Sequence, residues 1–226
     1  MVSKCPGQDT QFWGPDDIFT IECPKCGNAV EFFKDDIRRR CQSCGHMFLN
    51  PRLDLGCARW CQYANQCVGT IDKEEFKDII TSAIKEYFQG DEEKIGHALK
   101  VLRFAEKILE TEAGNPKVVL ASAILYEIGI YEHGKARRRP YITDQEKDEF
   151  SIVRGILERS GVKEEITEEV CRIIATHDHP HKINTLNGKI VHDAVQLAGL
   201  LESFKNEKKI FFTSAGQKMA EDMEHQ

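Results

Sequence analysis

The sequence predicts a mainly α-helical protein, in which a small cysteine-rich module precedes a helical bundle. Eight of the nine cysteines and both tryptophans lie within the first 67 residues. From residue 71 onward, apolar side chains recur every three to four positions, as they do on one face of an amphipathic helix. The change near Gly69-Thr70 therefore predicts two domains, residues 1–70 and residues 71–226.

Composition limits the partners and the compartment. The chain has 226 residues and a net charge of −6, so as a whole it does not attract nucleic acid or an anionic membrane. Nucleic-acid binding would rest only on the run Arg38–Arg40. The N-terminus lacks the apolar segment of a signal peptide, and no apolar run is long enough to span a membrane. We therefore expect a cytoplasmic protein without a membrane or nucleic-acid partner. The sequence does not indicate an oligomeric state.

Two CxxC pairs dominate the first module. Fourteen residues separate Cys23-Pro-Lys-Cys26 from Cys41-Gln-Ser-Cys44, and a glycine follows each pair. Between the pairs, residues 29–33 have the composition of a strand and residues 34–36 that of a turn. The pattern resembles a zinc ribbon over residues 21–48, with one tetrahedral zinc held by four cysteines. The alternative is four thiols without a metal.

A second four-cysteine site is also expected in this module. Cys57 and Cys61 lie one helical turn apart, Cys67 follows a short loop, and Cys5 is the remaining cysteine nearby. Four thiolates accept either zinc or an iron–sulfur cluster, and the spacing does not distinguish the two. The alternative is that these are small buried thiols, as we expect for Cys171 in the helical part.

Helices follow one another in the second domain, with glycine, proline and capping residues at their ends. The expected helices span residues 73–89 after a cap at Asp72, 91–113, 117–130, from the capping box Thr143-x-x-Glu146 to Ser160-Gly161, 163–178 and 188–204. Residues 133–140 read as a loop and residues 209–213 as a short strand. Ser214 is expected to cap a last helix.

The helix at residues 117–130 is the centre of this domain. Its sequence, KVVLASAILYEIGI, is almost continuously apolar, and Asn115-Pro116 forms a favourable helix start. Glu127 interrupts the apolar face. Because a buried carboxylate is costly without a partner, Glu127 requires a cation, a metal or a retained proton.

Three other helices carry a polar residue on an apolar stripe. Together with Glu127 these residues are His97, His177 and Asp193. A lone histidine in such a place is usually a satisfied core residue, but inward-facing histidines and carboxylates on several helices of a bundle are typical of metal sites. Imidazole with carboxylate suits zinc, iron, manganese or nickel. His192 is expected to point to another face and to be structural.

Residues 72–205 resemble the HD domain, a superfamily of all-helical metal-dependent phosphohydrolases. The similarity lies in the segments GHALKVLRFAEKILE, LASAILYEIG, EEVCRIIATHDH and KIVHDAVQLAGL, and KKIFFTSAGQKMAE resembles the tail of some bacterial HD proteins. The resemblance implies that His97 and Asp193 are the first and last metal ligands. Tyr126-Glu127 replaces the signature His-Asp pair, and the resemblance offers His177 as a residue that could supply the missing nitrogen.

The resemblance implies hydrolysis of a phosphate ester or nucleotide, with a small phosphorylated molecule as ligand. Glu127 and Asp193 would hold the metal or orient water, while Lys100 and Arg103 would bind phosphate oxygens. In this reading His97, Glu127 and Asp193 converge on one divalent metal. The alternative is a non-catalytic HD-like domain that binds a nucleotide or a protein, with the cysteine module as a structural or redox-sensing part.

Overall fold

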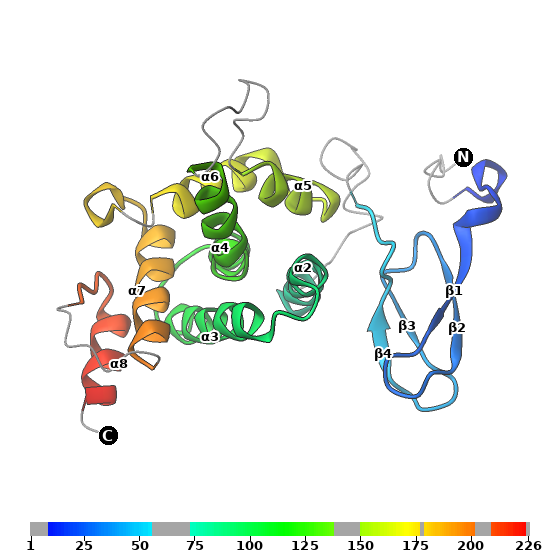
Figure 1. The fold of residues 1–226 in the computed structure, drawn as a ribbon, viewed down its shortest axis with the longest axis horizontal. Coiled ribbons are helices and arrows are strands. Elements are labelled where there is room, and N and C mark those ends of the chain that lie inside the picture. Colours follow the sequence, from blue (N-terminus) through cyan, green and yellow to red (C-terminus); the bar gives the residue numbers. More distant parts are fainter. Residues whose placement is uncertain (1–8, 56–72, 138–149, 177–178, 202–208, 225–226) are drawn as a thin grey trace. The chain divides into compact units, whose positions relative to one another are not determined.

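The computed structural model describes residues 9–55, 73–137, 150–176, 179–201 and 209–224. The chain divides into two compact units, which we describe separately. Within the described ranges, four short strands lie in the first unit and seven α-helices in the second, and Figure 1 shows their course. The predicted mainly α class, with a small cysteine-bearing strand region ahead of the helices, is confirmed.

Two antiparallel hairpins form the first unit. Strand β1 (Ile18–Glu22) pairs with β2 (Ala29–Phe33), and β3 (Arg38–Arg40) pairs with β4 (Met47–Leu49). Two 3₁₀ turns, Thr10–Phe12 and Pro15–Asp17, precede β1. The sequence predicted β2 at its observed bounds, whereas the three other strands were not predicted.

A single aromatic residue organises the core of the hairpins. Phe32 is fully buried, stacks on Phe19 across the strand pair, and meets the ring of Phe48 from β4 edge-on at 5.2 Å between centroids. Val30 lies on the same face of β2, two residues away, and is also buried. This small core holds the two hairpins together and positions the cysteine loops at their ends.

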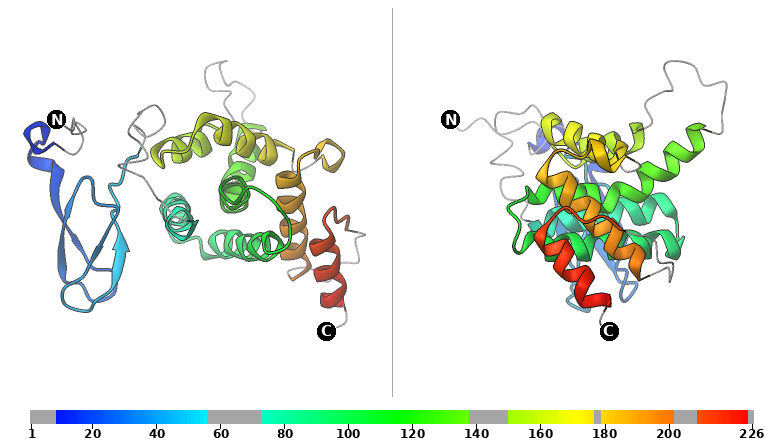
Figure 2. Two further views of the ribbon diagram at one scale, coloured as in Figure 1. Left: turned by 180° about the vertical axis from the view of Figure 1, so that it is seen from behind. Right: turned by 90° about the vertical axis from the view of Figure 1, so that its left-hand side faces the viewer.

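The second unit is a helical bundle around α4. Figures 1 and 2 show α4 among the other helices, and it contacts α2, α3, α6 and α7. The helices are α2 (Lys73–Phe88), α3 (Glu92–Leu109), α4 (Pro116–Arg137), α5 (Ser151–Arg159), α6 (Glu164–Ala175), α7 (Leu186–Leu200) and α8 (Ser214–Glu224). None of the helices within the described ranges has both the length and the hydropathy needed to cross a bilayer.

The central helix begins where the sequence predicted but ends later. Oδ1 of Asn115 accepts a hydrogen bond from the backbone N–H of Lys117 at 3.0 Å, and Pro116 occupies the first helical position. The predicted end was residue 130, with a loop at 133–140, but α4 continues to Arg137. The extension contains good helix formers such as Lys135, Ala136 and Arg137, and the single Gly134 does not outweigh them.

Other predicted boundaries also shift. Helix α3 stops at Leu109 rather than at residue 113, α6 stops at Ala175 rather than at residue 178, and α7 runs from Leu186 to Leu200 rather than over 188–204. The capping box at residues 143–146 and the cap at Asp72 lie outside the described residues. The expected end at Ser160-Gly161 is correct, since Gly161 takes a left-handed conformation with φ of 69° after α5.

The predicted strand at residues 209–213 is wrong. This segment is irregular, and its backbone N–H groups bind the Asp193 side chain instead of a neighbouring strand. Thr213, not Ser214, caps α8, because its Oγ1 accepts the N–H of Gly216 at 2.9 Å.

Candidate functional site

The four ribbon cysteines form the one group of three or more metal-binding side chains within the described residues. Their sulfur atoms all lie within 4.8 Å of one another. Cys23 Sγ and Cys44 Sγ are 3.7 Å apart, and Cys26 Sγ and Cys41 Sγ are 3.6 Å apart. Four thiolates placed tetrahedrally about one metal ion at ~2.3 Å would have sulfurs ~3.8 Å apart. The cluster therefore fits a single tetrahedral metal ion.

The backbone prepares these thiols for a cation. Gly27 N–H and Gly45 N–H return to the carbonyls of Cys23 and Cys41 at 2.8 and 2.9 Å, with both glycines left-handed. The backbone N–H of Cys44 lowers the pKa of the Cys41 thiol to about 7. The backbone N–H of His46 lowers the pKa of the Cys44 thiol, but burial and the neighbouring sulfurs outweigh this effect and raise the pKa to about 12. Four thiolates so close together repel one another unless a metal ion neutralises them.

Glu127 has the partner that its position required. His97 of α3 and Glu127 of α4 face each other, with Nδ1 of His97 2.9 Å from Oε2 of Glu127. Both side chains are about one-fifth exposed, so the pair lies at the edge of the core and not at its centre. A turn away on each helix, the ammonium group of Lys94 lies 5.5 Å from the ring centroid of Tyr131. The pair offers two donors that suit a divalent metal.

Asp193 lies elsewhere, against the C-terminal segment. It is fully buried on α7, and it accepts hydrogen bonds from Phe212 N–H at 2.9 Å and from Thr213 N–H and Oγ1–H at 2.7 Å each. Burial raises the pKa of this carboxyl, while the same donors oppose the shift. A Cβ added at Gly216 would come within 2.5 Å of Oδ2, which shows how closely α8 approaches. The carboxylate is thus occupied by the start of α8.

The structure does not bring Asp193 to the His97–Glu127 pair. Beyond the four cysteines, no three ligand atoms of histidine, cysteine or carboxylate side chains gather within 4.8 Å in the described parts of the chain. The expected convergence of His97, Glu127 and Asp193 is therefore not found. His177 lies outside the described residues, as do Cys5, Cys57, Cys61 and Cys67 of the expected second cysteine site.

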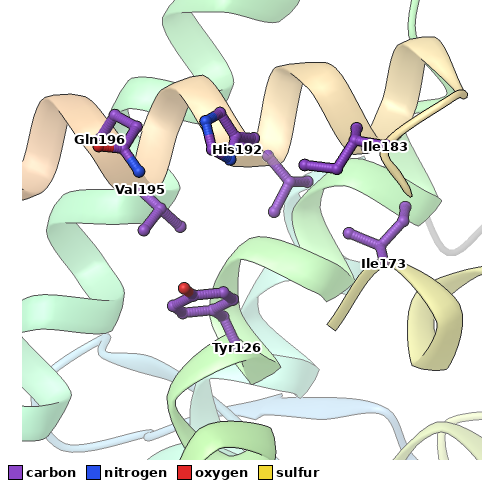
Figure 3. Close-up of a pocket in the computed structure, with 8 residues that line it drawn as sticks. Tyr126, Ile173, Ile183, His192, Val195 and Gln196 are labelled. Carbon is purple, nitrogen blue, oxygen red and sulfur yellow. The ribbon is translucent and has the colours of Figure 1, made fainter. Parts of the chain in front are cut away.

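His192, which was expected to be structural, lines a small pocket between α4 and α7. Figure 3 shows a pocket between Tyr126 of α4 and His192 and Val195 of α7, closed on one side by Ile173 and Ile183. His192 is 7% exposed, and burial lowers the pKa of its imidazole. Its Nε2 lies 3.2 Å from the carbonyl oxygen of Ile210, and its ring lies 5.0 Å from that of Phe212. No sequence signal distinguished it, because α7 is buried on most of its surface.

The remaining candidates lie apart from this pocket. Arg103 is exposed and Lys100 is half-buried on α3. His179 precedes the 3₁₀ turn Pro180–Lys182, and its ring lies 5.7 Å from that of His181. Cys171 is buried in the core, as expected.

Comparison with known proteins identifies the helical unit. Residues 95–200 match the family model described as HD domain, and this segment is an HD domain. No curated protein and no solved structure matches the chain. The match covers α3 to α7 and therefore includes both the His97–Glu127 pair and the pocket at Tyr126.

Proposed function

We propose that this HD domain binds a small ligand without hydrolysing a phosphate ester, and that the cysteine module holds one structural zinc ion. The observation that carries the first part is the position of Asp193, whose carboxylate already binds three donors from the C-terminal segment. In HD phosphohydrolases, by the resemblance above, the corresponding acid completes a metal centre. Here the described residues offer the two donors of His97 and Glu127, which are fewer than the three protein ligands usual for a catalytic metal.

Tyr126 supports the same proposal. It replaces the histidine of the family signature, and a phenol is a poor substitute for a neutral imidazole as a metal ligand. Its side chain instead lines a pocket with Val195 and two isoleucines. A pocket of this composition favours binding of an apolar group over activation of water for attack on phosphorus.

A phosphohydrolase remains the second candidate, and the His97–Glu127 contact favours it. An imidazole and a carboxylate 2.9 Å apart could share a manganese, iron, nickel or zinc ion, with His177 as a further ligand. Lys100 and Arg103, one and two turns along α3, would then hold phosphate oxygens of a nucleotide or other phosphate ester. When bound, such a metal would lower the pKa of a water molecule and polarise the phosphoryl group.

Manganese binding and turnover distinguish the two candidates. Manganese prefers oxygen and nitrogen ligands over the thiolates of the cysteine module, so its electron paramagnetic resonance spectrum reports on the helical domain. We expect weak manganese binding and no hydrolysis of p-nitrophenyl phosphate, its bis ester or nucleotides by the full-length protein. Restoring the family residue with Tyr126→His should bring no turnover.

The matched control is Glu127→Gln, which preserves shape and removes the charge. If the parent protein turns over any of these esters and Glu127→Gln abolishes that activity, the phosphohydrolase is correct and the binding proposal is wrong. If manganese binds tightly to the parent but not to Glu127→Gln, the metal centre exists despite the position of Asp193.

A further inference from the structure

The second hairpin of the cysteine module has one face that combines arginines with apolar side chains. Directly opposite residues of an antiparallel pair lie on the same face, and β3 and β4 pair Arg38 with Leu49 and Arg40 with Met47. Phe48, between the two apolar residues, packs on the opposite face, inward against Phe32. Both arginines are exposed, and Met47 is 41% exposed. This face therefore carries two positive charges and no carboxylate.

The backbone of β4 leaves hydrogen-bonding groups at its outer edge. Asn50 N–H donates to the carbonyl oxygen of Ile37 at 2.9 Å, and Cys41 N–H donates to that of His46 at 2.8 Å. Hydrogen-bonded and non-hydrogen-bonded pairs alternate along an antiparallel ladder. The pairs of Met47 and Leu49 are therefore of the second kind, and the N–H and C=O groups of these two residues point away from β3.

This outer edge has no strand beside it within the described ranges. The sheet contains only β3 and β4, and none of the described residues forms a hydrogen bond to the outward backbone groups of Met47 or Leu49. Figure 1 shows β4 at the side of its hairpin away from β1 and β2. An open edge of this kind is a template for pairing with another extended chain.

The charge of the face limits which chain can pair there. A strand added beside β4 would lie two strand spacings, about 9–10 Å, from β3. Arginine and glutamate side chains together can bridge that distance, with the apolar stems of Arg38 and Arg40 lying across Leu49 and Met47. Acidic side chains on the added strand would therefore meet both guanidinium groups.

The same features favour a peptide over a nucleic acid. Proteins that bind single strands stack the bases on aromatic rings, whereas the neighbours of the two arginines on this face are a methionine and a leucine. Alternating N–H and C=O groups match the backbone of an extended peptide, and a phosphate backbone has no donors to pair with the carbonyls.

We propose that the outer edge of β4 binds an extended acidic segment of a partner protein by strand addition, with its carboxylates bound to Arg38 and Arg40. This inference goes beyond the proposed function, because it gives the cysteine module a partner in addition to a structural metal. It is independent of what the helical domain binds.

The probe is a blocked seven-residue peptide of alternating glutamate and valine, and its matched control has lysine in place of glutamate. Both are added to the zinc-loaded, full-length protein, labelled with ¹⁵N, at about pH 7. We expect the glutamate peptide to slow amide hydrogen exchange of Met47 and Leu49 by at least about tenfold, because their N–H groups then donate to peptide carbonyls. The lysine peptide should leave these two amides unchanged, since it brings like charges to the arginines.

Two pairs of variants separate the backbone contribution from that of charge. Met47→Pro removes one outward N–H without removing a bond of the β3–β4 ladder and should abolish protection of Leu49, whereas Met47→Ala keeps the N–H and should retain it. Arg40→Glu should weaken binding by about tenfold or more. Lys182→Glu makes the same charge change at an exposed position of the helical domain and should have no effect.

Zinc content and the amide spectrum show whether each variant is folded, and Arg40→Glu decides the test if Met47→Pro is not. Slow exchange of both edge amides in the protein alone would mean that the edge is already paired, and this overturns the proposal. So does a glutamate peptide that gives no protection, or protection that is unchanged in Arg40→Glu. If single-stranded oligothymidine shifts the resonances of this face while the glutamate peptide does not, the face binds nucleic acid and the proposal is wrong.

Discussion

Substitution of Asp193 tests whether this residue anchors the C-terminal helix or serves a metal. In Asp193→Asn, the amide oxygen can take the place of Oδ2 and keep both Thr213 donors, and the amide NH₂ then faces Phe212 N–H in place of Oδ1. A hydrogen bond to a charged group contributes about 1.5–3 kcal/mol. Because burial has already raised the pKa of the carboxyl, removal of the charge offsets part of this loss. We expect a net destabilisation of about 1–2 kcal/mol.

Asp193→Ala should cost more, because it leaves three donors without a partner. Two of these, the Thr213 N–H and hydroxyl, belong to a buried residue. At about 1–3 kcal/mol for each unsatisfied buried group, and with some relaxation of the segment, we expect about 3–5 kcal/mol. The assay is urea unfolding followed by circular dichroism of the helices, since the change concerns helix α8 and its docking on α7.

A pair of glycines supplies the matched control. An alanine Cβ at Gly216 would lie 2.5 Å from Oδ2 of Asp193, whereas one at Gly96 in α3 would meet nothing within 4 Å. Gly96→Ala should therefore stabilise the helix by about 0.4–1 kcal/mol, and Gly216→Ala should destabilise the protein. The anchoring role is refuted if Asp193→Asn and Asp193→Ala both stay within about 0.5 kcal/mol of the parent, the range of ordinary surface substitutions.

Three further predictions concern other parts of the chain. Cys23→Ser or Cys44→Ser should remove about one equivalent of zinc per chain, measured by metal analysis, and unchanged zinc would exclude the ribbon site. Ser122→Ala should raise the free energy of unfolding by about 1–2 kcal/mol in urea, because the Ser122 hydroxyl is buried in α4 without a partner among the described residues; a loss of stability would contradict this. Burial lowers the pKa of His192 in the folded protein. The contribution of this residue to stability is therefore complete above the pKa of about 6.5 in the unfolded chain, and it is lost as the pH falls through the folded pKa. His192→Gln, whose amide can still donate to Ile210, should therefore reduce the loss of stability between about pH 8 and pH 5, and an unchanged pH dependence would disprove the assignment.

Much of the fold followed from local patterns in the sequence. The CxxC spacing indicated the metal-binding geometry of the first unit, because the sulfurs of two such knuckles meet wherever a ribbon closes. Asn115-Pro116 and the apolar run after it gave the start and the burial of α4. The expected approach of His97 and Glu127 is found, with Nδ1 of His97 2.9 Å from Oε2 of Glu127, whereas the expected approach of Asp193 is not.

The C-terminal segment could not be predicted in this way. Residues 209–213 are rich in residues that favour strands, but among the described residues no strand lies beside them to pair with. Their N–H groups are instead satisfied by a carboxylate twenty positions earlier in the chain. A side chain that replaces a strand as hydrogen-bond acceptor leaves no periodic signal, so only the tertiary structure reveals it.

The burial of both His192 and Asp193 has one physical cause. Periodicity identifies a core-facing residue only when the opposite face of its helix meets water, and α7 packs against α3 and α4 while α8 packs against α7. Both neighbouring residues are therefore buried, at 7% and 0% exposure, although they point in different directions. The family resemblance assigned the polar function to the carboxylate. The hydrogen bonds instead show that this carboxylate is occupied by Phe212 and Thr213 of the C-terminal segment, so its burial reflects the docking of that segment on α7.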